Sequence, residues 1–331
     1  MVTQAQIAQK LGVSRQLVTF ALSGYSQISK KSRKRILDAA REMGYLPNPF
    51  ARALKKRRSG IIGLWIPDQI STHYTQVARE LNRLVKTARH ELIVSEVSIA
   101  EEQQMLSHVP MDGIFVVDAP EQAKIYRKLS ITSKVPIISM GADCFDNSDS
   151  VQVDLYSGTL EIMKHLTNSG FRRIAHATFI RDNSPRASRR LGYVRAMQKA
   201  KLKPEFIYYP LTEQQRPLAR QLIQDYVRDH GYPDAIFCHS DDVAMGIYRG
   251  LCDMKLRVPD DVAIVGCDGI QDTEYLECQL TTLVQPVAAM CATAWQFLMK
   301  RLDRTTTQPQ KAVLKPKLII RDSSLRPQKT A

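Results

Sequence analysis

The chain has 331 residues and a formal net charge of +14, and no apolar run approaches the roughly 20 residues of a membrane-spanning helix. This length suits a small module joined to a larger core. The N-terminus shows no apolar signal segment, so we expect a cytoplasmic protein that does not enter the membrane. Its six scattered cysteines lack metal-type spacing, and we expect neither a metal nor a cofactor.

Positive charge is concentrated at the N-terminal end of the chain. Residues 1–60 hold 13 Lys or Arg and only 2 acidic residues, a net charge of +11, whereas the remainder holds 34 basic and 31 acidic residues. Such a local excess of one sign is typical of a module that binds a polyanion. We therefore predict that the first 60 residues bind nucleic acid.

The stretch TQAQIAQKLGVSRQLVTFAL, residues 3–22, predicts two short helices joined by a tight turn. Thr3 and Gln6 have the spacing of a capping box, Gly12 permits the reversal, and Ser14 is a favourable N-cap for the second helix. The second helix should turn inward Leu17, Val18, Ala21 and Leu22. Its outward side chains are then Arg15, Gln16, Thr19 and Phe20. A helix-turn-helix unit presents such a face to base edges in the major groove.

A third helix and a basic linker should follow. The helix is expected to open after Ser29 and to stop at Gly44, which closes a small three-helix core. Asn48 and Pro49 favour one or two further helical turns, and the run from Lys55 to Arg58 suggests that these turns fold only against DNA phosphates. The alternative is an ordinary basic linker between domains.

From Ile61 onward, apolar strands alternate with amphipathic helices. In a first series we expect strands at 61–66, 92–97, 113–117 and 136–139, and helices at 72–89, 101–108 and 122–129. In a second series we expect helices at 156–168, 187–200, 217–229 and 242–254, and strands at 173–179, 206–210, 235–240 and 262–268. A closing helix at 287–304, strands near 313–320 and a loose tail from Ser323 complete the chain. The pattern predicts two helix-wrapped parallel sheets with a ligand site where their strand ends face each other.

Several spaced motifs carry a family resemblance. They are IAQKLGVSRQLVTFALSG at 7–24, GYLPNPFARAL at 44–54, RRLGY at 189–193, SDDVAMG at 240–246, RVPDDVAIVGCDG at 257–269 and LTTLVQP at 280–286. With these motifs in this order, the chain resembles the LacI/GalR family of bacterial transcription regulators over nearly its whole length.

The resemblance implies an N-terminal all-α helix-turn-helix DNA-binding domain at 1–46, a hinge helix and linker at 47–59, and a core at 60–331 for effector binding and dimerisation. The core would have the two-subdomain α/β architecture of the periplasmic-binding-protein-like type I kind. Its N-subdomain would comprise approximately 60–155 and 282–317, and its C-subdomain approximately 156–281 and 318–331.

The resemblance also implies a homodimer that reads a pseudo-palindromic operator in double-stranded DNA. Arg15, Gln16, Thr19 and Phe20 would lie in the major groove, where Arg suits guanine and Gln suits adenine. The hinge would enter the minor groove with Asn48, Ala51, Arg52, Leu54 and Lys55. Leu54 would be a wedge that unstacks the central base pairs, the alternative being a packing residue. Because the chain ends within a few residues of Ile320, without further apolar heptads, we expect a dimer and not a tetramer.

For the effector site the resemblance implies contacts from Tyr74, Asp143, Arg189, Ser240, Asp268 and Gln285. Aspartate and arginine at strand ends suit a polyol or sugar through paired hydrogen bonds. The arginines of the segment 172–190 raise a second possibility, a sugar acid or sugar phosphate: Arg172, Arg173, Arg181, Arg186, Arg189 and Arg190. The alternative is that only Arg189 reaches a neutral sugar.

Competing functions lack support in the sequence. The chain contains no phosphate loop, no GxSxG elbow and no HExxH motif, and the adjacent His239, Ser240 and Asp241 do not by themselves make a catalytic triad, so we expect no enzyme. A solute-binding transport protein would share the two-lobed core but would not need the basic residues 1–60. A nucleoid protein that coats DNA would not need the core. The sequence therefore indicates an effector-controlled regulator of transcription, most simply a repressor of a carbohydrate-use operon.

Overall fold

The computed structural model describes residues 2–22, 28–45, 58–67, 71–96, 109–118, 135–142, 144, 148–179, 187–210, 214–305 and 308–326. The chain divides into two compact units, Met1–Ser59 and Gly60–Ala331. Among the described residues, no helix is both long enough and apolar enough to cross a membrane.

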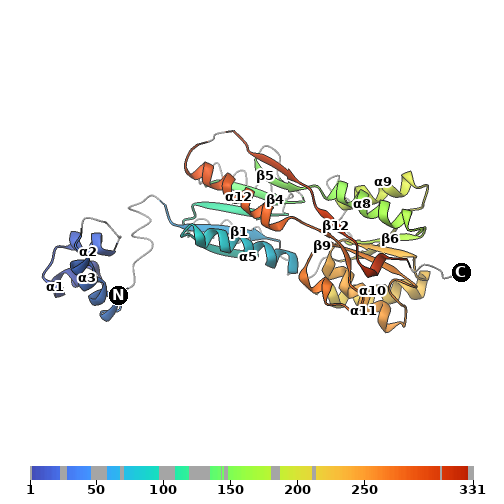
Figure 1. Ribbon diagram of the computed structural model, residues 1–331, viewed down its shortest axis with the longest axis horizontal. Coiled ribbons are helices and arrows are strands. Elements are labelled where there is room, and N and C mark those ends of the chain that lie inside the picture. The colour runs from blue at the N-terminus through green and yellow to red at the C-terminus, as the bar shows by residue number, and fades with distance from the viewer. Residues whose placement is uncertain are drawn as a thin grey trace. The chain divides into compact units, whose positions relative to one another are not determined.

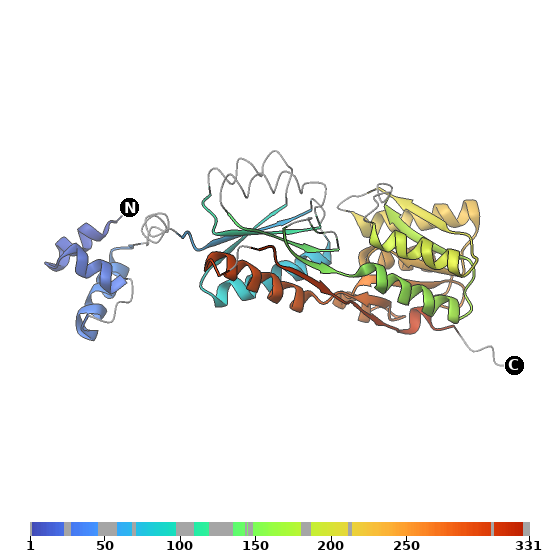
Figure 2. The same cartoon turned by 90° about the horizontal axis from the view of Figure 1, so that it is seen from above.

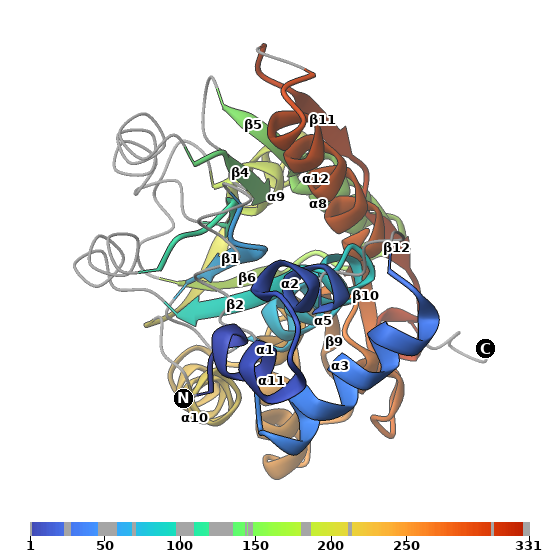
Figure 3. The same cartoon turned by 90° about the vertical axis from the view of Figure 1, so that its left-hand side faces the viewer.

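The first unit contains the helices α1 (Gln4–Leu11), α2 (Arg15–Leu22) and α3 (Lys30–Glu42), shown in blue in Figure 3. The predicted capping box is present, because the Gln6 amide donates to Thr3 Oγ1 and the Thr3 amide donates to Gln6 Oε1 at 2.8 Å. Gly12 ends α1 in the left-handed region, with φ at 63°. Ser14 Oγ accepts a hydrogen bond from the Leu17 amide at 3.2 Å, as expected of an N-cap.

These three helices close one small apolar core, as the sequence predicts. Ile7 on α1, Val18 on α2 and Ile36 on α3 are at most 2% exposed, and Leu17 and Leu22 pack half-buried against them. Because each helix is too short to be stable alone, this shared core is what keeps all three folded.

The first lobe of the second unit is a parallel six-stranded sheet in the order β11-β5-β4-β3-β1-β2. Its strands are β1 (Ile61–Ile66), β2 (Glu91–Glu96), β3 (Gly113–Val117), β4 (Ile137–Gly141), β5 (Asp149–Val153) and β11 (Lys311–Leu314). The helices α5 (Thr72–Thr87) and α12 (Val287–Leu302) pack against each other and on one face of the sheet (Figure 2).

The second lobe is a six-stranded sheet in the order β12-β10-β9-β8-β6-β7, in which only β12 runs antiparallel to its neighbour. Its strands are β6 (Ile174–Phe179), β7 (Glu205–Tyr209), β8 (Ala235–Cys238), β9 (Ala263–Asp268), β10 (Thr281–Val284) and β12 (Lys317–Ile319). Figure 1 shows α8 (Leu155–Asn168) and α9 (Ser188–Lys199) on one face, and α10 (Gln215–His230) and α11 (Asp241–Asp253) on the other. The short 3-10 helices are η2 (Gln271–Glu274) and η3 (Asp322–Ser324).

The two lobes are connected at 153–155, 284–287 and 314–317, where the chain passes from one sheet to the other. The first and third of these connections lie close to the predicted subdomain limits. The second differs, because β10 pairs with β9 and β12, so residues 282–284 belong to the second lobe and not to the predicted 282–317 part of the first.

The observed elements differ from the predicted ones at two short strands and at the start of the C-terminal segment. The sequence pattern did not predict β5 and β10, which are short and carry buried polar residues. The predicted loose tail from Ser323 is wrong at its start, because Ser323 and Ser324 are fully buried and Ser323 Oγ donates to the Ile264 carbonyl at 2.6 Å. The helices predicted at 101–108 and 122–129 lie outside the described residues.

The buried Tyr193 hydroxyl provides a test of the second lobe. It lies 2.7 Å from the Ile174 carbonyl and accepts from the Glu205 amide at 2.8 Å, joining α9 to β6 and β7. Tyr193→Phe should therefore lower the free energy of unfolding by about 1–2 kcal/mol, because the buried Ile174 carbonyl loses its donor and the partly buried Glu205 amide loses its acceptor. Urea unfolding followed by circular dichroism measures this. The matched control Tyr208→Phe, at a side chain that is 43% exposed, should cost less than about 0.5 kcal/mol; equal losses would contradict the assignment.

Candidate functional site

The predicted DNA-reading side chains lie on α2 in the first unit. Arg15 and Gln16 are exposed in its first turn, whereas Thr19 and Phe20 are half-buried. Thr19 Oγ1 lies 2.8 Å from Gln4 Oε1, and Gln4 Nε2 donates to the Tyr45 hydroxyl at 3.0 Å. Thr19 is thus held by α1, which leaves Arg15 and Gln16 as the side chains that are free to reach outward from this turn.

The start of α3 carries a second basic surface. Lys30, Lys31, Lys34 and Arg35 are exposed, and the first turn holds no acidic residue. Positive side chains at a helix N-terminus oppose the helix dipole and cost stability. A bound polyanion such as a DNA phosphate backbone would offset this cost, so α3 supports the same function as α2. The predicted hinge residues Asn48, Ala51, Arg52, Leu54 and Lys55 lie outside the described residues.

In the second unit, Asp268 lies at the carboxyl end of β9 in the second lobe. It is 5% exposed, its φ of 127° is rare for a residue with a side chain, and its Oδ1 accepts from Gln285 Nε2 at 2.8 Å. Burial raises the pKa of Asp268 to about 7, against the opposing charge of Arg189. Asp268 and Gln285, both predicted, therefore form a hydrogen-bonded pair at the end of the sheet.

Arg189, at the start of α9, is oriented by His239, a residue that sequence reasoning did not assign to the site. Arg189 Nη2 lies 2.6 Å from His239 Nε2. Burial and the neighbouring Arg189 charge hold the pKa of His239 well below its usual value, so the ring is neutral and its Nε2 can accept from the guanidinium. Its position directly before the SDDVAMG motif could have indicated that His239 lies at the site.

The two residues that follow His239 have hydrogen-bond partners within the second lobe. Ser240 is buried at the N-cap of α11, where its Oγ accepts from the Val243 amide at 3.3 Å and donates to Gln215 Oε1 at 3.4 Å. Asp241 accepts from the backbone amides of Gly269 and Ile270. His239, Ser240 and Asp241 thus have separate partners and do not form a triad.

The first lobe contributes Tyr74 on α5 and, beyond the prediction, Asp118 after β3. The Tyr74 hydroxyl donates to Asp118 Oδ2 at 3.5 Å, and Asp118 Oδ1 accepts from the Ala142 amide at 2.7 Å. Burial and the Asp118 charge raise the pKa of Tyr74 well above its usual value. The charges of Arg189 and Asp268 also act on Tyr74, so the described parts of the two lobes face each other here. Asp143, the remaining predicted contact, lies outside the described residues.

Two buried polar side chains of this region have atoms that lack a hydrogen-bond partner among the described residues. They are both ring nitrogens of His73, beside Tyr74, and Oε1 of Gln285. Burial lowers the pKa of His73 to about 4, so the ring is neutral and can donate through one nitrogen and accept through the other. Buried polar atoms without partners require an explanation, and a ligand with several hydroxyls would supply the missing contacts.

Of the arginines in the segment 172–190, three described ones other than Arg189 have partners elsewhere in the second lobe. Arg173 pairs with Glu205 at 2.7 Å, Arg172 Nη1 donates to the Thr167 carbonyl at 3.1 Å, and the Arg190 guanidinium stacks 4.9 Å from the Phe206 ring centroid. These three therefore contact other parts of the second lobe. Arg181 and Arg186 lie outside the described residues. Within the described ranges, no group of His, Cys, Asp or Glu is arranged to hold a metal ion.

Comparisons with known proteins cover both units. The pattern of the family described as bacterial regulatory proteins, lacI family, matches residues 4–48, and that of the periplasmic binding protein-like domain matches residues 163–324. The chain is 27% identical to the HTH-type transcriptional regulator RegA of Clostridium saccharobutylicum, over 96% of this chain and 98% of that protein. It is also 27% identical to the ribose operon repressor of Haemophilus influenzae, over 98% of each. Among solved structures, the lac repressor dimer bound to operator and the anti-inducer ONPF matches with a TM-score of 0.82 and 20% identity, over 98% of this chain and 99% of that one.

The raised pKa of Asp268 predicts a pH-dependent stability. An unfolded aspartate has a pKa near ~3.9, so between about pH 4 and 7 the folded chain binds this proton more tightly and the free energy of unfolding falls as pH rises. Asp268→Asn should reduce that fall while keeping an acceptor for Gln285. Urea unfolding at several pH values measures the slope, and the half-exposed Asp225→Asn should leave it unchanged. An Asp268→Asn slope equal to that of the unaltered chain would contradict burial of an ionisable carboxyl.

Proposed function

Because the chain belongs to the lacI family of bacterial regulatory proteins, we propose that it is a repressor of carbohydrate-use genes whose operator binding is controlled by a sugar-like ligand bound between the lobes. The observation that carries this proposal is the exposed, donor-rich first turn of α2, presented by a basic three-helix unit on a chain that also holds a two-lobed core. The relatives to which it is similar are named as regulators and repressors of transcription, and the protein is not an enzyme.

On the DNA side, we propose that Arg15 and Gln16 read base edges in the major groove and that Thr19 and Phe20 contact its wall. Arg15 follows the Ser14 cap directly, so its guanidinium projects from the helix end that enters the groove in helix-turn-helix proteins. Asn48, Ala51, Arg52, Leu54 and Lys55 are proposed to form the minor-groove hinge, with Leu54 as the wedge. Two copies of the chain would read two inverted half-sites, as expected of a homodimer.

On the ligand side, the described residues favour a neutral polyhydroxylated molecule. The proposed contacts are Tyr74, Arg189, Ser240, Asp268, Gln285 and, outside the described residues, Asp143. Ser240 also caps α11. The groups whose charges act on Tyr74 include Asp118, Arg189 and Asp268, and the pKa of Asp268 is raised to about 7. An anion would meet more negative than positive charge there, whereas hydroxyls can bond to both signs. A relative named ribose operon repressor is consistent with a sugar.

The alternative of a solute-binding transport protein shares only the core. A transport function does not explain the three-helix unit and its basic surface. The function of a repressor explains both units. The basic helices of the first unit and the ligand-binding residues of the second are therefore assigned to one regulator.

Arg15 provides the test of DNA reading. Selection of bound sequences from random DNA by the full chain should yield two inverted half-sites, and Arg15→Ala should relax the preference at one base pair per half-site, at a cost of about 1–3 kcal/mol. The basic control variant Lys31→Ala, in α3, should weaken binding to all sequences alike. Loss of affinity without loss of preference in Arg15→Ala would show that Arg15 contacts phosphate only.

Paired neutral and acidic sugars test the ligand class. Two pairs are tested by calorimetry: ribose with ribose 5-phosphate, and glucose with gluconate. In a pair that binds, the neutral sugar should bind more tightly than its acidic counterpart. The double variant Arg181→Ala/Arg186→Ala should leave the affinity for the neutral member unchanged. Preference for the acidic member, lost in this double variant, would establish an anionic ligand instead.

A further inference from the structure

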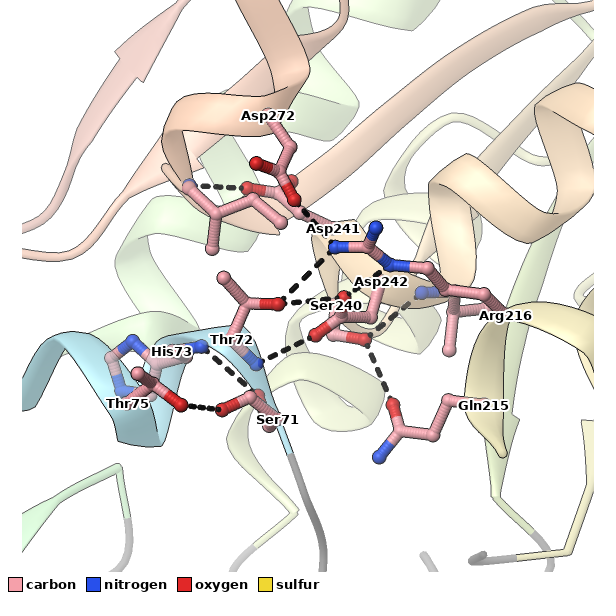
Figure 4. Close-up of polar contacts among 12 residues, drawn as sticks. Ser71, Thr72, His73, Thr75, Gln215, Arg216, Ser240, Asp241, Asp242 and Asp272 are labelled. Atoms are coloured by element: carbon pink, nitrogen blue, oxygen red, sulfur yellow. Dashed lines mark hydrogen bonds and ion pairs between the residues drawn. The ribbon is translucent and has the colours of Figure 1, made fainter. Parts of the chain in front are cut away.

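A group of polar contacts joins the start of α5 in the first lobe to the second lobe (Figure 4). The Thr72 amide donates to Asp242 Oδ2 and the Thr72 hydroxyl donates to Asp242 Oδ1, each at 3.0 Å. Thr72 is the first residue of α5, and Asp242 is the second residue of α11. One carboxylate of the second lobe therefore holds two donors of the first.

Arg216 on α10 completes the connection. Its Nε donates to Asp242 Oδ1 at 2.7 Å, and its Nη2 donates to Asp272 Oδ2 at 2.7 Å and to Thr72 Oγ1 at 3.2 Å. The Arg216 guanidinium thus donates to Asp242 through one nitrogen and to Asp272, on η2, through another. A planar guanidinium with several fixed donors suits such bridging. Figure 4 shows the Arg216 side chain lying between Asp272 above and Asp242 below.

Asp242 is not needed for the cap of its own helix. Ser240 already accepts from the Val243 amide at the N-cap of α11, and Asp241 binds the loop after β9. The Asp242 side chain is only 6% exposed, and a carboxylate this buried is costly unless it is paired. Its partners among the described residues are Thr72 of the first lobe and Arg216 of its own lobe, so separation of the lobes would remove two of its three hydrogen-bond donors.

The residues next to Thr72 belong to the candidate ligand site. His73 and Tyr74 follow it on the first turn of α5, where the charges of Arg189 and Asp118 act on both. A displacement of the α5 start away from α11 would therefore move both side chains relative to the second lobe.

We propose that Asp242 and Arg216 are positioning residues that brace the start of α5 against the second lobe and so hold His73 and Tyr74 opposite Arg189 and Asp268. Every contact of this brace joins two protein groups, so the brace acts without a ligand. The role of the brace in ligand binding rests on the proposed function, whereas the brace itself can be tested separately.

Hydrogen exchange of the full chain, with no sugar added, is the test. In Arg216→Met, amides of the α5 start at residues 72–75 should exchange about tenfold faster or more, because the loss of a side chain in one lobe releases a helix start in the other. The matched control is Arg220→Met. Arg220 lies one turn further along α10 and pairs with Asp253 of its own lobe at 2.5 Å, so its loss should leave these amides within about twofold.

Thr72 gives a second, independent variant pair. Thr72→Val removes the hydroxyl donor at nearly constant volume and should accelerate the same amides, whereas Thr72→Ser keeps the donor and should restore slow exchange. Unchanged exchange in both Arg216→Met and Thr72→Val, or equal acceleration in Arg220→Met, would overturn the brace. Selection of DNA by the unaltered chain reports on the proposed function separately, since exchange at α5 does not depend on DNA binding.

Discussion

The first turn of α11 carries two buried carboxylates on which the organisation of the core depends. Asp241 accepts from the Gly269 amide at 2.7 Å, the Ile270 amide at 2.9 Å and the Thr282 hydroxyl at 2.7 Å. Burial, together with the nearby Asp268, raises the pKa of Asp241, while these three donors lower it again. A fully buried carboxylate is tolerated only with such compensation. The loop after β9 and the strand β10 are thereby fixed to α11. Asp242, the next residue of α11, accepts two hydrogen bonds from Thr72 of the first lobe.

This anchoring determines the geometry of the candidate ligand site. Asp268 directly precedes the amides that Asp241 holds, and Gln285 follows the strand that carries Thr282, so both side chains are placed by contacts of α11. Asp118, on the opposite lobe, has a φ of 46°, and Asp268 has a φ of 127°. Unfavourable backbone conformations persist only where their surroundings fix them, and they concentrate at functional sites. Both lobes thus place an aspartate of unusual backbone conformation at the candidate ligand site, and Thr72 at the start of α5 contacts the second lobe beside it.

The parts of the structure that sequence predicted well are those set by neighbours along the chain. Thr3 with Gln6, Ser14 with Leu17 and Gly12 act within one helical turn, so their pattern is visible in the sequence. The missed residues Asp242, Thr72 and His239 depend on partners far away along the chain. Asp242 and Thr72 are 170 positions apart, and His239 is 50 positions from Arg189, which was predicted. The same limitation explains why the pairing of Arg173 was not predicted, since its partner Glu205 is 32 positions away. It also explains why β10 was not predicted, since its buried threonines are satisfied by the Arg321 carbonyl and by Asp241, which are distant in the sequence.

In the proposed function, a ligand bound by the core alters DNA binding by the first unit. The most direct measurement is the operator affinity of the full chain, by fluorescence anisotropy, with and without a saturating concentration of the sugar that calorimetry shows to bind. We expect the operator affinity to change tenfold or more, in either direction, which corresponds to a coupling free energy of about 1.4 kcal/mol or more. An operator affinity that stays constant while the sugar is bound would contradict it.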